Sequence, residues 1–170
     1  MGRSSDLERF TLNRGELCAC SFAFDIPVPV IIEESEVSGR LHVELELGAP
    51  VPSGGLERER LKLTLEFAGQ RVASSGGSGY FEDELMEIRR QMPKFVFIKA
   101  CINCLFSDYH PGGQPAFGGM LCFRNIKAEY LQVKSKRDLF AVIRRRDRLV
   151  QETYLCPEFS PRISGTGYRG

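Results

Sequence analysis

The chain has 170 residues, of which 42% are hydrophobic and 26% are charged. This length is typical of one domain, and the apolar content is too high for an intrinsically disordered protein. No stretch approaches the ~20 apolar residues of a membrane-spanning helix, and the opening MGRSSDLERFTLNRGE is too polar for a secretory signal peptide. We therefore expect a single cytoplasmic domain over residues 1–170, with no membrane partner.

The net charge of +1 conceals two halves of opposite sign. Residues 1–94 carry 11 Lys and Arg against 16 Asp and Glu, whereas residues 95–170 carry 12 against 6. The two halves should attract each other, which favours packing in one body. A basic half can equally face an acidic partner, so the asymmetry alone selects no function.

Residues 1–73 are predicted to be rich in β-strands, because apolar and polar residues alternate along them. The alternation occurs at residues 10–13, 16–24, 39–47 and 60–67. Proline has no N–H to donate, so the first strand should break at Asp25–Val30, which contains two prolines. Ala68-Gly69-Gln70 is predicted to turn the chain into a return strand. The region should form an antiparallel sheet with one wet face.

A flexible joint at residues 74–79 separates this sheet from an amphipathic helix predicted at about residues 80–92. The helix has one apolar stripe, made of Phe81, Leu85, Ile88 and Met92. Acidic residues lie in its first turn and arginines in its last, an order that suits the helix dipole. Pro93 should end it.

Residues 80–159 form the cysteine-containing α/β subregion. Its predicted elements are a buried strand at 95–100, short strands at 120–124 and 129–133, and a helix at about 136–151 capped by Ser135 and Asp138. Residues 160–170 are predicted to be a disordered tail. The predicted fold class is α+β, with an N-terminal antiparallel β-sheet followed by a helix and a zinc-stapled strand, loop and helix unit.

Four of the six cysteines point to a metal site: Cys101, Cys104, Cys122 and Cys156. Cytoplasmic thiols stay reduced, so a disulfide framework is not expected. Zinc takes four ligands at the corners of a tetrahedron, and a C-x2-C turn supplies two of them from one stretch of backbone. We therefore predict that these cysteines hold one structural Zn²⁺. The alternative is that Cys122 and Cys156 are ordinary buried thiols, because the second pair is split along the chain.

A thiol redox enzyme is another alternative for Cys101 and Cys104, because thioredoxin-like sites also place C-x2-C after a buried strand. That chemistry needs a helix beginning at the motif, which lowers the pKa of the thiol. Residues 105–113 are not expected to form one, since they contain Pro-Gly-Gly. Cys18 and Cys20 lie two apart in a predicted strand and should point to the same face. Packing under the sheet is favoured over a second metal site, because no matching pair of ligands is at hand.

His110 lies in the loop near the predicted zinc site and could act as a metal ligand or as a base for Cys104. A histidine without a catalytic role is favoured, because the sequence supplies neither an orienting third group nor an oxyanion hole.

The basic segment, residues 134–148, is the best candidate for contacts with nucleic acid. Helical spacing places Arg144, Arg145 and Arg148 opposite the apolar residues of the predicted helix. Arg146 falls within the apolar stripe and should be covered and paired with a carboxylate. A solvated helix face is the favoured interpretation of this segment.

The leading functional hypothesis is a non-enzymatic binding protein that carries one structural four-cysteine zinc site and recognises another protein. The first alternative is a nucleic-acid-binding zinc regulator that uses residues 134–148. The second is a thiol redox enzyme at Cys101 and Cys104.

Overall fold

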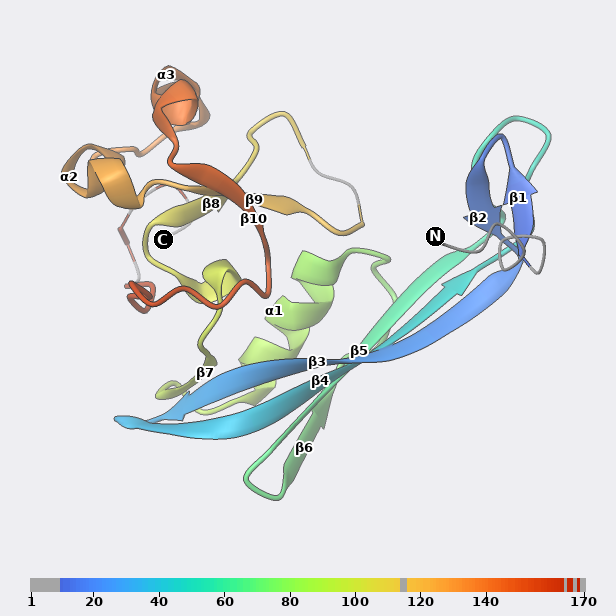
Figure 1. Cartoon of the computed structure of the whole chain (residues 1–170), viewed down its shortest axis with the longest axis horizontal. Coiled ribbons are helices and arrows are strands. Elements are labelled where there is room, and N and C mark those ends of the chain that lie inside the picture. Colours follow the sequence, from blue (N-terminus) through green and yellow to red (C-terminus); the bar gives the residue numbers. More distant parts are fainter. Residues whose placement is uncertain (1–9, 114–115, 164, 167, 169–170) are drawn as a thin grey trace, which may run out of the picture.

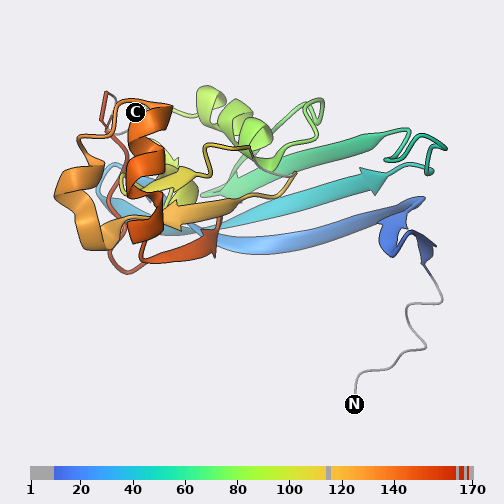
Figure 2. The ribbon, with the colours of Figure 1, turned by 90° about the horizontal axis from the view of Figure 1, so that it is seen from above.

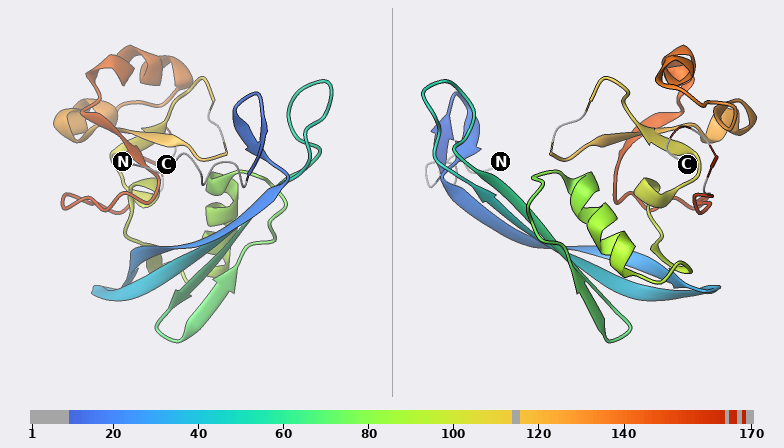
Figure 3. Two further views of the ribbon diagram at one scale, coloured as in Figure 1. Left: turned by 45° about the vertical axis from the view of Figure 1, so that its right-hand side comes forward. Right: turned by 180° about the vertical axis from the view of Figure 1, so that it is seen from behind.

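The computed structural model describes residues 10–113, 116–163, 165–166 and 168. A long twisted sheet forms one side of the molecule, with helix α1 (Phe81–Gln91) lying on one face (Figure 1). The C-terminal strands and helices gather over the same face, near one end of the sheet (Figures 1 and 3). The α+β class is confirmed.

The long sheet has five antiparallel strands in the order β6-β5-β4-β3-β7. Its members are β3 (Cys20–Ile32), β4 (Ser35–Leu47), β5 (Glu59–Phe67), β6 (Gln70–Ala73) and β7 (Val96–Ile98). β3 and β4 pair over their full lengths, from Cys20 opposite Leu47 to Ile32 opposite Ser35. The predicted hairpin of β5 and β6 is present, and the predicted strand at 39–47 begins four residues earlier.

The predicted break at the prolines is wrong, because β3 runs through Pro27 and Pro29 without interruption. The N–H of Lys99 donates to the Pro29 oxygen at 2.8 Å, so Pro29 directs its backbone groups away from β4. Pro27, two residues earlier, faces the same way. The missing N–H groups therefore lie on the side away from β4, and the β3–β4 ladder loses no donor.

The main core lies between one face of the long sheet and α1. Val43, Leu63 and Leu65 are fully buried on this face, where they pack in one cluster with Phe81 and Ile88 of the helix. The helix occupies the predicted residues and has the predicted apolar stripe. Burying a Leu or Phe side chain contributes about 1.5–3 kcal/mol, so this contact is a large source of stability.

The joint at residues 74–79 is held in place by helix α1 and is not a free linker. Glu84 is buried, and its carboxylate accepts hydrogen bonds from the N–H groups of Gly76 and Ser78, both at 2.9 Å. Glu87 accepts from the N–H of Ser75 at 3.0 Å. Two acidic residues of the helix therefore fix the glycine-rich segment that precedes it.

A separate hairpin of β1 (Thr11–Asn13) and β2 (Glu16–Cys18) stands at the far end of β3 and β4 (Figure 1). Ala19 has a φ of 50° and separates β2 from β3. Cys18 and Cys20 therefore lie in two strands, which corrects the prediction that they share one strand face; Cys18 is buried and Cys20 half-buried. The polar opening residues 1–9 lie outside the described residues.

The C-terminal unit, residues 99–163, is built on a small sheet in the order β10-β9-β8. Its strands are β8 (Ser107–Tyr109), β9 (Gly119–Cys122) and β10 (Arg148–Gln151). Its helices are η2 (Cys101–Asn103), η3 (Arg124–Ile126), α2 (Lys127–Tyr130), α3 (Lys136–Val142) and η4 (Ile143–Arg145), where η denotes a 3₁₀ helix. Figure 2 shows α2 and α3 at the end of the molecule opposite the β1–β2 hairpin.

Two of the secondary-structure elements predicted for this unit are wrong. The predicted strand at 129–133 is part of a helical turn, in which Tyr130 and Val133, three residues apart, are both buried against Phe123. The predicted helix at 136–151 ends early, because residues 148–151 instead form β10 and pair with β9. The predicted cap is present: Ser135 Oγ accepts from the N–H of Asp138 at 3.2 Å.

Within the described part of the chain, no helix combines the length and apolar character needed to cross a bilayer.

Candidate metal centre

Cys101 and Cys104 lie in one tight turn that follows β7. The N–H of Cys104 donates to the Cys101 oxygen at 3.0 Å, which closes the turn around η2. The Asn103 side chain donates to the Ile98 oxygen at 2.9 Å and ties the turn back to the strand. The sequence therefore places two thiols on one short, closed stretch of backbone, as a C-x2-C metal site requires.

Cys122 reaches this turn through the small sheet. It is the last residue of β9, where it lies opposite Ser107 of β8. The Ser107 hydroxyl donates to the backbone oxygens of Cys101 and Cys104, the latter at 3.1 Å. A single buried serine thus links the strand that carries Cys122 to the C-x2-C turn.

Cys156 is brought to the same place by the segment that follows β10. The N–H of Cys101 donates to the Tyr154 oxygen at 3.1 Å, and the N–H of Leu105 donates to the Ser160 oxygen at 2.8 Å. Residues 154–160 therefore run alongside the C-x2-C turn, with Cys156 between the two hydrogen bonds. The proximity arises from backbone pairing that the spacing of the cysteines does not reveal.

All four thiols are buried, and they interact with one another. Burial, together with charge on Cys104, Cys122 and Cys156, raises the pKa of Cys101 to about 12. Burial also raises the pKa of Cys122, while the backbone N–H of Arg124 donates to its sulfur and opposes that shift. An N–H directed at a cysteine sulfur stabilises the thiolate, which is the form that binds a metal.

The donor set fits zinc by its chemistry, because four soft, buried thiols are the ligands of a closed structural site. Among the described residues, however, no three His, Cys, Asp or Glu side chains converge closely enough to hold a metal ion as they stand. The structure thus brings the four cysteines into one region of the core without arranging their sulfurs as a tetrahedron.

A positive side chain lies beside the cysteines. Burial raises the pKa of both Cys101 and Cys122, and the charge of Arg124 opposes part of that rise. Its guanidinium pairs with Asp147 at 2.9 Å and with Glu158 at 3.4 Å. Zinc with four thiolates carries a net negative charge, and Arg124 would offset part of it.

The segment predicted to be a disordered tail contributes to this region. Pro161 forms a bridge with Cys104, and Arg162 donates through Nη2 to the backbone oxygens of Cys104 at 2.7 Å and Ser107 at 2.5 Å. The predicted disorder therefore does not extend to residues 160–162. Residues 164, 167, 169 and 170 of the predicted tail lie outside the described residues.

Buried polar residues surround the cysteines, and sequence reasoning missed their role. Tyr130 donates through its hydroxyl to the carboxylate of Asp108 at 3.0 Å, and burial raises the pKa of Tyr130. Glu152 accepts from the N–H of Gly118 at 2.5 Å and from the Tyr109 hydroxyl at 3.3 Å. Burial raises the pKa of Glu152. Alternation in a three-residue strand is too short a signal to show that Ser107 and Asp108 are buried.

The context expected of a redox enzyme is absent at the C-x2-C turn. η2 has three residues and is followed by strand β8, so no α-helix begins at Cys101 or Cys104. The pKa of Cys101 is raised rather than lowered, chiefly by burial. His110 is exposed, and its Nδ1 accepts from the N–H of Gly112 at 3.0 Å.

The basic segment, residues 134–148, does not form one continuous helical face. Arg145 makes two hydrogen bonds with Glu129, and Arg148 pairs with Asp147 at 2.7 Å. Arg146 is exposed at the end of η4, where it donates to the Ile143 oxygen at 3.2 Å. The predicted burial of Arg146 is wrong, because the helix ends before the apolar stripe reaches it.

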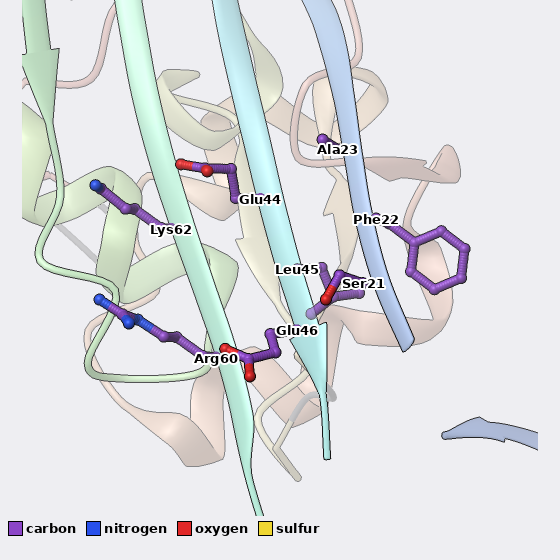
Figure 4. Close-up of a pocket in the computed structure, with 8 residues that line it drawn as sticks. All are labelled: Ser21, Phe22, Ala23, Glu44, Leu45, Glu46, Arg60 and Lys62. Carbon is purple, nitrogen blue, oxygen red and sulfur yellow. The ribbon is translucent and has the colours of Figure 1, made fainter. Parts of the chain in front are cut away.

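A hollow of about 380 Å³ opens on the polar face of the long sheet, away from the cysteines (Figure 4). It is lined by Ser21, Phe22, Ala23, Glu44, Leu45, Glu46, Arg60 and Lys62. Glu44 lies opposite Lys62 and Glu46 lies opposite Arg60 on neighbouring strands, so each acid faces a base. This arrangement balances charge across the sheet and does not direct a set of like groups at a ligand.

The profile of one protein family, described as "Family of unknown function (DUF6304)", matches residues 2–107. The chain belongs to this family. The DUF6304 match spans the β1–β2 hairpin, the strands of the long sheet, α1 and the C-x2-C turn, so it includes Cys101 and Cys104 but neither Cys122 nor Cys156. The search of curated proteins and the search of solved structures each found no match.

Proposed function

We propose that this chain is a non-enzymatic interaction protein whose C-terminal unit is held together by one structural Zn²⁺, bound by Cys101, Cys104, Cys122 and Cys156. The observation that carries the proposal is that hydrogen bonds of the C-x2-C turn to Ser107 and to residues 154–160 bring four buried thiols from three separate segments into one region. When bound, zinc would replace the thiol protons and cross-link the three segments. Reduced thiols suit the cytoplasm, where we place the protein.

A structural role is favoured because four protein ligands leave no open position for a substrate. The two histidines of the chain lie elsewhere. His42 contacts Asp25 at 2.7 Å on the polar face of the sheet, and His110 is exposed in a loop. Neither is positioned with a cysteine as a nucleophile and its base, which supports the non-enzymatic interpretation.

The experiment is a measurement of zinc content in purified protein, with two matched variants. We expect about one zinc per chain in the wild type and in Cys18→Ser, and a loss of zinc in Cys122→Ser. Cys18 is the control because it is as buried as the four proposed ligands but lies in the distant β1–β2 hairpin.

Replacement of the metal by Co²⁺ provides a second readout. A tetrahedral four-thiolate site should show intense sulfur-to-cobalt charge-transfer bands that are lost in Cys122→Ser. A wild-type protein that binds neither metal, or that loses both equally in Cys18→Ser, would contradict the proposal.

The interaction surface proposed for a protein partner is the part of the apolar sheet face that α1 leaves uncovered, at the end of the sheet near the β1–β2 hairpin. Phe24 of β3 is 43% exposed there, and Phe10 and Leu12 at the neighbouring hairpin are 40% and 48% exposed. Clustered exposed apolar side chains mark contact surfaces in proteins of this size.

Nucleic-acid binding through residues 134–148 is the second candidate. It is supported by Lys136, Arg137 and Arg144, which are exposed and have no ion pair among the described residues. Gel-shift or anisotropy measurements over a salt series test it, because phosphate contacts weaken steeply as salt rises. Salt-dependent binding of RNA or DNA by the wild type would place this function ahead of protein recognition.

A further inference from the structure

Among the residues that the structure describes, one long edge of the five-stranded sheet is only partly paired. β3 pairs with β4 along its whole length, but on its other side β7 pairs only with Val30, Ile31 and Ile32. In the described structure, no strand lies beside residues 20–29 on that side, and Figure 2 shows this edge running toward the β1–β2 hairpin. Exposed strand edges pair readily with another chain, because their N–H and C=O groups are unused.

The outward-facing residues of this edge follow from the position of Pro29. Pro29 directs its carbonyl away from β4, toward Lys99, so residues an even number of positions away point the same way. Ser21, Ala23 and Asp25 therefore present their N–H and C=O groups outward, and all three are exposed. Even-numbered residues make the ladder with β4.

Two features limit the usable edge to residues 20–26. Ala19, with its φ of 50°, ends the strand on one side. Pro27 has no N–H and ends the row of donors on the other. The centre of this segment is Ala23, so its two ends lie at equal distances from the middle residue.

The segment is complementary to itself. In an antiparallel pair with Ala23 opposite Ala23, Ser21 faces Asp25 and Phe22 faces Phe24, each pair occurring twice. The outward N–H and C=O groups of one copy meet those of the other, and the aromatic residues form the closer, non-hydrogen-bonded pairs. In Figure 4 the Phe22 ring projects from the side of β3 away from β4, and it stacks on Phe10 of the same chain with 6.0 Å between the ring centroids.

Charge does not oppose this pairing. The Asp25 carboxylate already contacts His42 Nδ1 at 2.7 Å and Arg40 at 3.6 Å, so its charge is compensated within one copy. The Ser21 hydroxyl opposite it can donate a further hydrogen bond. The other edge of the sheet, β6, has only four residues, and its Ala73 oxygen accepts from the Gln91 side chain at 2.9 Å.

We propose that two copies of this chain dimerise through antiparallel pairing of β3 residues 20–26, with the two-fold axis passing between the two Ala23 residues. The axis is perpendicular to the sheet, so the two five-stranded sheets join as one and keep their apolar faces on the same side. The proposal names a second copy as a partner for the interaction protein proposed above, and it does not depend on the metal.

The same register brings further apolar residues together. Leu155 is 48% exposed and lines a hollow with Pro27 and Pro29. Because Pro27 of the second copy lies opposite Ala19, Leu155 of the second copy is placed toward the β1–β2 hairpin, which carries the exposed Leu12. The dimer would thus cover apolar side chains that a single copy exposes.

The test uses the full chain and opposite charges at the two-fold axis. Ala23→Asp and Ala23→Lys each place like charges directly opposite each other, so each variant alone should be monomeric by sedimentation velocity. Mixed in equal amounts they should restore the dimer, because Asp then faces Lys. Ser38→Asp and Ser38→Lys are the controls, since Ser38 is exposed on the same polar face but lies on β4; both should remain dimeric.

Circular dichroism establishes that each variant is folded, and Ala23→Pro gives an independent check. That change removes a central outward N–H that the β4 ladder does not use, so it should yield a folded monomer. A wild type with the mass of one chain at every concentration, or Ala23→Asp and Ala23→Lys variants that dimerise separately, would overturn the proposal. Zinc content is measured in the same samples, so failure of the dimer and failure of the metal site are told apart.

Discussion

The long sheet and the C-terminal unit are held together in different ways. In the sheet, β3 and β4 each have 13 residues and pair throughout, and one face carries a continuous apolar core. The strands of the C-terminal unit have three or four residues, its apolar cluster around Phe123 is small, and its interior also holds thiols and the buried polar residues Ser107, Asp108 and Glu152. The sheet therefore rests on one large apolar core, whereas we expect the C-terminal unit, with its smaller apolar cluster, to depend more on specific polar contacts and on its thiols.

This difference predicts which substitutions will destabilise each region. Apolar burial is non-directional, so a truncated side chain weakens the sheet in proportion to the volume lost. Buried thiols and polar groups need particular partners, and removing one partner leaves the others unsatisfied in a low-dielectric interior.

The largest effect is expected from Cys104→Ser. If the four cysteines bind zinc, this change should remove ~3 kcal/mol or more from the stability of the C-terminal unit, because metal binding contributes directly to folding. Cys18→Ser should cost no more than an ordinary core substitution. Thermal melts of both variants with bound metal provide the measurement, and equal shifts would show that Cys104 is not a ligand.

The next largest loss of stability is expected when a side chain in the core of the long sheet is truncated. Leu63→Ala removes a fully buried side chain and should cost ~2–5 kcal/mol. We expect the whole chain to unfold earlier in urea while the zinc content of the folded protein stays unchanged. Lys62→Ala, its neighbour on the opposite face, should shift the midpoint little. A loss of zinc in Leu63→Ala would show that the two regions are not separate in their stability.

Glu84→Gln should cost ~1–3 kcal/mol, because the amide leaves N–H donors of the joint without the carboxylate acceptor. Burial raises the pKa of Glu84, but hydrogen bonds from Ser74, Ser78 and Gly76 outweigh it and hold the pKa below its usual value. The pKa of Glu84 is thus lower in the folded state than in the unfolded state. Its contribution to stability is fully present above the usual pKa of a glutamate and is lost as the pH falls through the folded-state pKa.

Urea unfolding at several acidic pH values tests whether stability falls with pH in this direction. The wild type should lose stability toward low pH more steeply than Glu84→Gln. Asp83→Asn is the matched control, since Asp83 lies in the same helical turn but is exposed. Parallel pH profiles for wild type and Glu84→Gln would show that the joint does not depend on this carboxylate.

The smallest effect is expected when Arg144, Arg145 and Arg148 are all replaced by Gln. These side chains are exposed, and exposed ion pairs contribute little to stability. The melting temperature should hardly change, and Arg145→Ala should shift it slightly more than Arg146→Ala because only Arg145 pairs with Glu129. A large fall in RNA or DNA affinity in the triple variant would instead support the nucleic-acid function.

The sequence predicts the regions whose structure is determined locally. The alternation of Leu61, Leu63 and Leu65 and the stripe of Phe81, Leu85 and Ile88 define β5 and α1, because each element is several residues long and has one apolar side. The strand through Pro27 and Pro29 was not predictable, because a proline interrupts a ladder only if its missing N–H faces the partner strand, and that depends on the register.

The C-terminal unit was predicted less well, because its structure depends on contacts between residues that are far apart in the sequence. Whether residues 148–151 continue a helix or form a strand is decided by β9, about thirty residues earlier. The cysteines themselves can be identified by their spacing and residue type. Ser107, Tyr154 and Arg162 were not predictable as their neighbours, because all three contact backbone groups of the C-x2-C turn, and a backbone group leaves no pattern in the residue types.

Amide hydrogen exchange before and after removal of metal by a chelator tests the central claim most directly. If zinc holds the C-terminal unit and the sheet is stable on its own, chelation should abolish protection in residues 101–109, 119–123 and 148–160. Protection in β3, β4, β5 and α1 should remain. Unchanged protection throughout, or a uniform loss that includes the sheet, would contradict the account.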